Sequence, residues 1–169
     1  MGRNVEIKAL VADLALTCKR VEMIADSGPF VIEQEDTFFV CPNGYLKVRA
    51  FSETEGELIY YKRPDSAEPR VSHYVRSKPS DPRSLCDALT SALGIRGIVR
   101  KKRTLYIIGQ TRVHLDEVKN LGSFVELEVV LSPQQAISEG ISIAHEVMEK
   151  LGINKDDLVG KSYIDLFEL

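Results

Sequence analysis

Apolar and polar residues alternate along several short segments of this chain, and a period of two residues is typical of β-strands with one buried face. The first such segment, residues 4–10, places Val5, Ile7 and Ala9 on one side and polar residues on the other. Strand-like segments recur at residues 30–41, 45–51, 56–65, 69–76, 95–109, 111–118 and 120–131. Short turns separate most of them, so we expect about eight strands connected mainly as antiparallel hairpins.

A period near 3.6 residues predicts helices between some of these strands. One helix is expected to begin after Asp13, a residue suited to cap a helix N-terminus, and to stop at Ser27 and Gly28. A second is expected to begin at Asp81 and to end at Gly94. Both helices are amphipathic, so each can cover an apolar sheet face.

The pattern for a third helix is the clearest in the chain. Ser132 and Gln135 predict a capping box. Pro133 suits the first helical position and Gly152 suits the end. The expected buried stripe of this helix comprises Ile137, Ile141, Ala144, Met148 and Leu151. With an apolar tail at residues 160–169 that can pack on the rest, the chain is predicted to form a single α+β domain over residues 1–169, whose sheet is either open or closed into a barrel.

The second face of the predicted strands is charged, with arginine dominant. Its members are Glu6, Lys8, Lys47, Arg49, Arg63, Arg70, Arg112, Asp116, Glu126 and Glu128. If the helices wrap the outside of a barrel, this charged face lines the inside. Patterning alone leaves open a two-layer sheet whose charged face meets water.

The residue types on the charged face point to phosphate chemistry. Arginine binds phosphate oxygens through two parallel hydrogen bonds. Carboxylates two residues apart on one strand, as at Glu126 and Glu128, point the same way and can hold Mg²⁺ or Mn²⁺. Together they predict a site for a metal–triphosphate complex. His114 shares this face and could be an acid or base near its ordinary pKa of about 6.5, or a hydrogen-bonding group in the tunnel.

Composition narrows the class of partner. The 169 residues carry 22 Lys and Arg against 25 Asp and Glu, a net charge of −3, which argues against coating of nucleic acid. The basic run at residues 100–103 could be a nucleic-acid patch, but a solvated or tunnel-facing strand is favoured. No apolar run approaches the ~20 residues that span a bilayer. We therefore expect a cytoplasmic protein, with neither a membrane nor a nucleic acid as partner.

The opening segment NVEIKA resembles the E-x-E-x-K strand of the CYTH superfamily, the triphosphate tunnel metalloenzymes. The ordered stretches QEDTFF, NGYLKVR, ELIYYKRPD, KKRTLYIIGQTRVHLDEVKNLGSFVELEVVL and GKSYIDLFEL are similar to the rest of that family, most of all to its class IV adenylate cyclase-like branch. The resemblance implies an eight-stranded antiparallel β tunnel with helices packed outside. It also implies binding of triphosphates with a divalent metal ion.

The resemblance assigns roles residue by residue. The metal ligands for Mg²⁺ or Mn²⁺ would be Glu6, Asp116, Glu126 and Glu128. Lys8 and Arg63 would be the catalytic groups at the phosphates. The residues that bind substrate phosphates would be Lys47, Arg49, Arg70, Arg103 and Arg112, with the strand phase of Arg103 left open. The strand pattern, rather than the resemblance, adds His114 to this substrate-binding set. Three positions depart from the family pattern: Asn4 stands in place of its first Glu, Tyr45 in place of a basic residue, and Lys62 where relatives often carry an acid.

The expected function is a metal-dependent phosphohydrolase acting on an inorganic or organic triphosphate, of the tripolyphosphatase or thiamine-triphosphatase type. One alternative is an adenylate cyclase, which converts ATP to cyclic AMP and pyrophosphate. Because of Asn4 and Tyr45, another alternative is a tunnel that binds or ionises a diphosphate ester without triphosphatase activity. In each case the partner is a small polyphosphate or diphosphate molecule, and the protein is expected to be a monomer or a homodimer.

Overall fold

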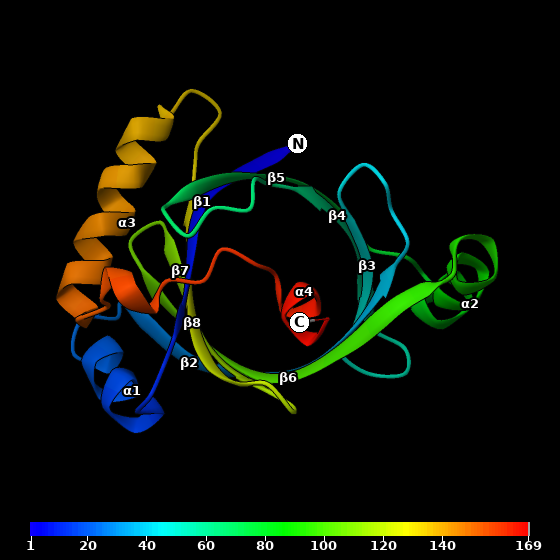
Figure 1. The fold of residues 1–169 in the computed structure, drawn as a ribbon, viewed down its shortest axis with the longest axis horizontal. Helices are drawn as coiled ribbons and strands as arrows, with labels where there is room; N and C mark the ends of the chain where they lie inside the picture. The colour runs from blue at the N-terminus through cyan, green and yellow to red at the C-terminus, as the bar shows by residue number, and fades with distance from the viewer. Residues whose placement is uncertain (169) are drawn as a thin grey trace.

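Eight antiparallel strands close into a barrel in the computed structural model, which describes residues 1–168 (Figure 1). Around the barrel the strands follow the order β1-β5-β4-β3-β2-β6-β7-β8. Their bounds are β1 Gly2–Leu10, β2 Ser27–Phe39, β3 Tyr45–Ala50, β4 Gly56–Lys62, β5 Arg70–Ser77, β6 Ile95–Ile108, β7 Thr111–Val118 and β8 Gly122–Val130. The predicted α+β tunnel is confirmed, and the open two-layer sheet is excluded.

The barrel closes where the first strand meets the last. Strand β1 pairs with β8 on one side and with β5 on the other, antiparallel in both cases. In this register Glu6 lies opposite Glu128, and Lys8 lies opposite Glu126. Closure therefore brings charged residues from the first and last strands onto one part of the barrel wall.

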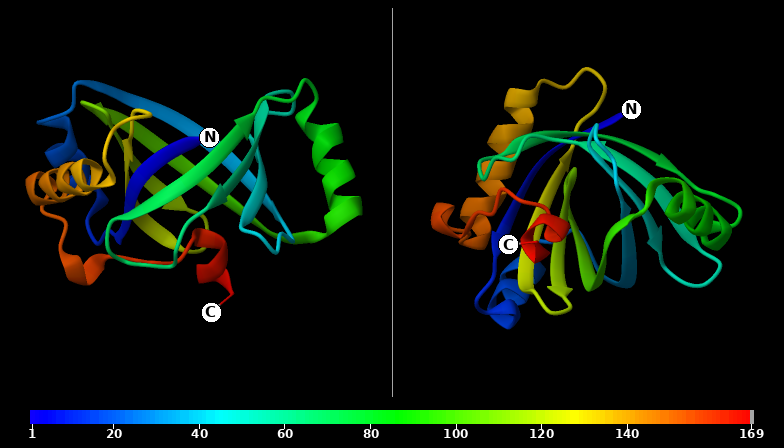
Figure 2. Two further views of the ribbon diagram at one scale, coloured as in Figure 1. Left: turned by 90° about the horizontal axis from the view of Figure 1, so that it is seen from above. Right: turned by 45° about the vertical axis from the view of Figure 1, so that its right-hand side comes forward.

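The helices lie outside the strands, except at one mouth of the barrel. Helices α1 (Leu14–Glu22) and α3 (Ile137–Leu151) cover one side of the barrel, and α2 (Pro82–Leu93) packs on the opposite side (Figures 1 and 2). Helix α4 (Tyr163–Phe167) lies within the ring of strands when the barrel is viewed end-on (Figure 1). A short 3₁₀ turn, Lys155–Asp157, connects α3 to this final segment.

Two of the predicted helix starts are confirmed by their caps. The Asp13 carboxylate accepts a hydrogen bond from the Leu16 amide at 3.0 Å, and Asp81 accepts one from the Ser84 amide at 3.0 Å. These side chains satisfy amides that lack a partner in the first helical turn. Among the described residues no helix is both long and apolar enough to cross a bilayer.

Helix α3 begins later than predicted, at Ile137. The Gln135 side chain does accept from the Ser132 amide, at 3.2 Å, but the two residues close a turn that precedes the helix. The capping role passes to Glu139, whose carboxylate accepts from the Ala136 amide at 2.9 Å. Ile137, predicted to be buried, is 40% exposed at the helix start. The first helix also ends earlier than predicted, at Glu22, and β2 begins at Ser27.

The apolar core lies on the outer surface of the barrel, beneath α1 and α3. Side chains of β1, β7 and β8 that point outward, including Ile7, Val113 and Leu127, pack with Met148 of α3. Helix α3 approaches so closely at Gly140 that a Cβ there would lie 2.7 Å from a side-chain carbon of β1. Because successive residues of a strand point to opposite faces, an apolar outside leaves the charged positions facing the lumen.

Candidate functional site

The interior of the barrel contains a cavity of about 90 Å³. Its lining includes seven basic and four acidic side chains: Lys8, Lys47, Arg49, Arg63, Arg76, Lys101 and Arg103, with Glu6, Asp36, Glu126 and Glu128. Positive charge is in excess, so the cavity favours an anion. Eight predicted site residues line this cavity. The other four do not line it, but each lies within 4.0 Å of a charged lining residue: Arg70, Arg112, His114 and Asp116.

The carboxylates of β1 and β8 are held by basic residues across the lumen. Arg63 lies 3.0 Å from Glu6, measured from Nε to Oε1. Lys8 Nζ lies 3.3 Å from Glu126 Oε1, and the Arg103 guanidinium donates to the other oxygen of Glu126 at 2.8 Å. Acid and base are thus paired side by side, which limits the repulsion that a ring of cations would otherwise create.

Asp36 of β2 is a site residue that the sequence analysis did not identify. It is 1% exposed and accepts hydrogen bonds from Lys47 at 2.9 Å and from Arg49 at two atoms, both at 2.8 Å. Burial opposes its ionisation, but Arg49 and Lys47 outweigh that effect and hold the Asp36 pKa well below its usual range. Asp36 therefore fixes two lumen cations in place.

The strand phase of Arg103 is settled by its pairing. Arg103 lies opposite Asp116 and forms a bidentate ion pair with it, at 2.7 Å for both bonds. Lys101 also faces inward, whereas Lys102 is exposed on the outside. The oxygens of Asp116 are occupied by Arg103 and by the Tyr163 hydroxyl, which donates at 2.7 Å. This geometry favours a role for Asp116 in positioning Arg103 over contact with a cation.

The C-terminal segment closes one end of the lumen. Lys8 Nζ donates to the carbonyl of Lys161 at 3.0 Å, and Arg63 donates to the carbonyl of Gly160 at 2.9 Å. The Lys8 ammonium also lies 3.9 Å from the centre of the Tyr163 ring. Tyr45 does not line the lumen, and instead its hydroxyl donates to Asp165 of α4 at 2.7 Å. The two predicted catalytic groups thus contact backbone oxygens of the tail.

Burial shifts the pKa values of several lumen groups towards neutral pH. It raises the pKa of Glu6 to about 7, although Arg63 opposes the shift. It lowers the pKa of Lys8 to about 8. It lowers that of Lys47 to about 7, and the charge of Arg49 adds to the effect. These groups are therefore poised to gain or lose a proton when an ion enters the lumen.

His114 is buried behind Glu126 and Glu128. Burial lowers its pKa to about 3, and the charge of Arg103 acts in the same direction. The imidazole is therefore neutral near pH 7, which does not favour the alternative of an acid or base with the ordinary pKa. No hydrogen-bond partner for its Nδ1 is found in residues 1–168.

The residues at the junction of β1, β7 and β8 can accommodate a divalent cation. Ligand atoms of His114, Glu126 and Glu128 lie within 4.8 Å of one another. Asn4, at the family position of a Glu, is 3% exposed, lines the lumen, and its Oδ1 is without a hydrogen-bond partner among residues 1–168. Unpartnered oxygen and nitrogen donors beside two carboxylates fit Mg²⁺ or Mn²⁺.

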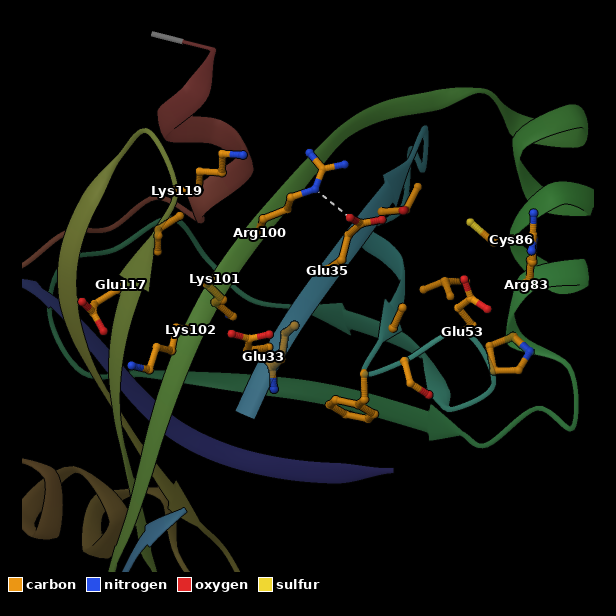
Figure 3. A pocket seen from close by; sticks show the side chains of 18 of the residues that line it. Glu33, Glu35, Glu53, Arg83, Cys86, Arg100, Lys101, Lys102, Glu117 and Lys119 are labelled. Carbon is orange, nitrogen blue, oxygen red and sulfur yellow. Dashed lines mark hydrogen bonds and ion pairs between the residues drawn. The ribbon is translucent and has the colours of Figure 1, made fainter. Parts of the chain in front are cut away.

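A larger groove of about 1060 Å³ lies on the outer face of the sheet, bordered by α2 and the β7–β8 turn (Figure 3). Its charged lining is balanced, with five acidic and five basic residues, and includes the ion pair of Glu35 and Arg100 at 2.7 Å. An excess of one charge is absent there, so the groove attracts an anion less than the lumen does. The smaller cavity is therefore the candidate functional site.

Comparison with known proteins agrees with this architecture. The family model for the CYTH domain matches residues 2–163. A curated relative from Methanocaldococcus jannaschii, provisionally named as an adenylate cyclase, is 32% identical over 68 residues, which are 40% of this chain and 39% of that protein. The chain thus aligns with less than half the length of that relative.

Solved structures share the fold over nearly the whole chain. The PH1012 protein from Pyrococcus horikoshii OT3 has a TM-score of 0.86 at 24% identity, covering 96% of this chain and 98% of that one. The protein HpAC1 from Hippeastrum, described as having a dominant triphosphatase activity, has a TM-score of 0.66 at 16% identity, covering 99% and 95%. Since the family model spans almost all of the chain and the barrel is shared, the chain belongs to the CYTH domain family.

Proposed function

We propose that the lumen binds the phosphate chain of a triphosphate together with Mg²⁺ or Mn²⁺ and hydrolyses it. The observation that carries this proposal is the opposition, inside one closed cavity, of an excess of Lys and Arg to the carboxylates of Glu6, Glu126 and Glu128. A chelated polyphosphate needs both charges at once, because its oxygens require cationic donors and its metal ion requires carboxylates.

The residues of the chain would act mainly by positioning and charge. Arg49 and Arg103 are fixed by Asp36 and Asp116, so their remaining N–H groups are already oriented for phosphate oxygens. Lys8 and Arg63 donate to tail carbonyls in this structure and would exchange those oxygens for phosphate oxygens. The divalent ion, when bound, supplies charge neutralisation for the transferred phosphoryl group.

The size of the cavity favours an inorganic triphosphate over a nucleotide. Its volume of about 90 Å³ is well below the ~300–1,000 Å³ of pockets that enclose organic ligands of drug size. A linear phosphate chain can extend along the tunnel, whereas a nucleoside would remain at the mouth. The triphosphatase activity described for HpAC1 supports hydrolysis, while the names of other relatives keep cyclisation of ATP as the alternative.

The experiment is an incubation of the protein with tripolyphosphate, thiamine triphosphate or ATP, with Mg²⁺ or Mn²⁺ present. We expect release of orthophosphate, fastest from tripolyphosphate, and a loss of at least tenfold in Glu126→Gln on the scale of a removed electrostatic group. Glu35→Gln, an exposed carboxylate on the outer face, is the matched control and should keep its activity. Cyclic AMP as the product would favour the cyclase. No product from any substrate would overturn the proposal of hydrolysis, and a rise in melting temperature with tripolyphosphate would then identify a binding protein.

A further inference from the structure

We propose that His114 supplies a nitrogen ligand, through Nδ1, to the divalent cation beside Glu126 and Glu128, and that this ligand makes the tunnel prefer Mn²⁺ to Mg²⁺. The inference rests on the proposed function, because it requires that the lumen takes a cation. It goes further in naming a ligand and a metal preference.

The backbone register places the three side chains together. His114 on β7 lies opposite Glu126 on β8, and Glu128 is two residues farther along the same face. His114 Nδ1 lies 4.0 Å from Glu126 Oε2. Two ligands on opposite sides of a small divalent ion are separated by twice a ligand bond of ~2.1 Å, or about 4 Å. An ion could therefore join these atoms if it replaced the contact of Arg103 with Glu126 Oε2.

Two of the candidate ligand atoms lack hydrogen-bond partners in the described part of the chain, whereas Glu126 Oε2 accepts from Arg103 at 2.8 Å. The His114 side chain is 6% exposed, and neither its Nδ1 nor Glu128 Oε2 has a hydrogen-bond partner within residues 1–168. Buried polar atoms are almost always satisfied in folded proteins, and an exception at a lined cavity calls for a missing ion or water. Glu128 is also 3.1 Å from Arg112 Nη2, but this ion pair leaves the imidazole unsatisfied.

The donor set decides the metal preference. Mg²⁺ prefers oxygen donors and binds imidazole weakly, whereas transition metals accept imidazole readily. Asn4 stands where the family pattern has a carboxylate and presents a neutral oxygen to the lumen. Replacing a carboxylate with an amide weakens attraction for Mg²⁺ and Mn²⁺ alike, because both carry the same charge. The preference for Mn²⁺ therefore rests on the imidazole.

The test is electron spin-echo spectroscopy of Mn²⁺ bound to the whole protein, which detects a directly coordinated nitrogen. We expect ¹⁴N modulation in the wild type, replaced by the ¹⁵N pattern when only histidine is labelled with ¹⁵N. This measurement needs no variant, so a folding defect cannot obscure it. His114→Gln should lose the modulation and bind Mn²⁺ at least about tenfold more weakly, with a smaller change for Mg²⁺. His73→Gln, an exposed histidine on β5, is the control and should change neither.

The outcomes separate the two proposals. Bound Mn²⁺ without nitrogen modulation would overturn the role of His114 and leave the cation in the tunnel intact. Mg²⁺ binding as tightly as Mn²⁺ would overturn the preference. Failure of the wild type to bind Mn²⁺ at all would overturn both this inference and the metal-dependent function on which it rests.

Discussion

Asp36 offers the sharpest test of how the lumen is held together, through the substitution Asp36→Asn. The substitution keeps the shape of the side chain and removes its charge. Two cations lose their counter-charge, Lys47 and Arg49, and both are more than nine-tenths buried. Breaking a buried ion pair on one side costs about 3–5 kcal/mol, because the remaining charge stays desolvated.

The expected cost lies at the low end of that range. Lys47 has a pKa of about 7 even with Asp36 present, so it can lose its proton and avoid an unpaired charge. Arg49 cannot, since a guanidinium stays protonated. With one unpaired cation we expect a loss of about 3 kcal/mol, and 2–4 °C per kcal/mol for a domain of this size gives a fall in Tm of roughly 6–12 °C.

Thermal unfolding by circular dichroism measures this loss, with Glu35→Gln as the control on the same strand. The Glu35 side chain is 44% exposed and pairs with Arg100, so its loss should cost less than about 1 kcal/mol. Tripolyphosphate should raise the Tm of Asp36→Asn more than that of the wild type, because its oxygens would replace the counter-charge that Lys47 and Arg49 have lost. Equal Tm values for the two variants, or a smaller shift with tripolyphosphate, would refute the reasoning.

Three further predictions follow from the lumen and the core. Lys101→Met should weaken tripolyphosphate binding by tenfold or more in calorimetry, whereas Lys102→Met on the outer face should keep the affinity within about twofold of the wild type. Equal effects of the two substitutions would mean that the cavity is not the binding site. Binding of tripolyphosphate at pH 8 should take up protons, because the pKa of Lys47 is depressed to about 7 in the free protein and a bound anion raises it. The affinity for tripolyphosphate should therefore fall as the pH rises above 7. Calorimetry in buffers of different ionisation enthalpy measures the proton uptake. Gly140→Ala should destabilise the fold by about 1–3 kcal/mol despite the better helix propensity of alanine, because the added methyl group would lie too close to a side chain of β1. Chemical denaturation measures this free energy. Ser138→Ala, on the exposed face of the same helix, is the control and should be neutral or stabilising.

Much of the fold could be predicted because the strands alternate strongly between apolar and polar residues. The start of α3 could not, since local chemistry favours Ser132 as the cap, whereas Ala136 has no side chain that can accept a hydrogen bond. In the structure Gln135 is also engaged by the Gln110 side chain at 2.8 Å. Contacts distant in sequence decide where the helix begins.

The alternation of apolar and polar residues also allowed part of the charged site to be predicted. Glu126 and Glu128 alternate with apolar residues, so only one orientation is possible. Asp36 could not be recognised because Glu35 beside it is also charged, and alternation cannot choose between two polar phases. The contacts of Lys8 with the tail involve backbone oxygens, which carry no signal in residue types.

The hydrogen-bonded pairing of β1 with β8, the seam that closes the barrel, has consequences for the synthesis of the protein and for the opening of the folded barrel. During synthesis the candidate ligands cannot meet until the last strand has left the ribosome, so a truncated chain contains half of a binding site and no function. Conversely, an ion or phosphate chain that spans the seam ties the two termini of the sheet together. It should protect amides of every strand from hydrogen exchange by a similar factor, because opening anywhere in the ring releases the ligand.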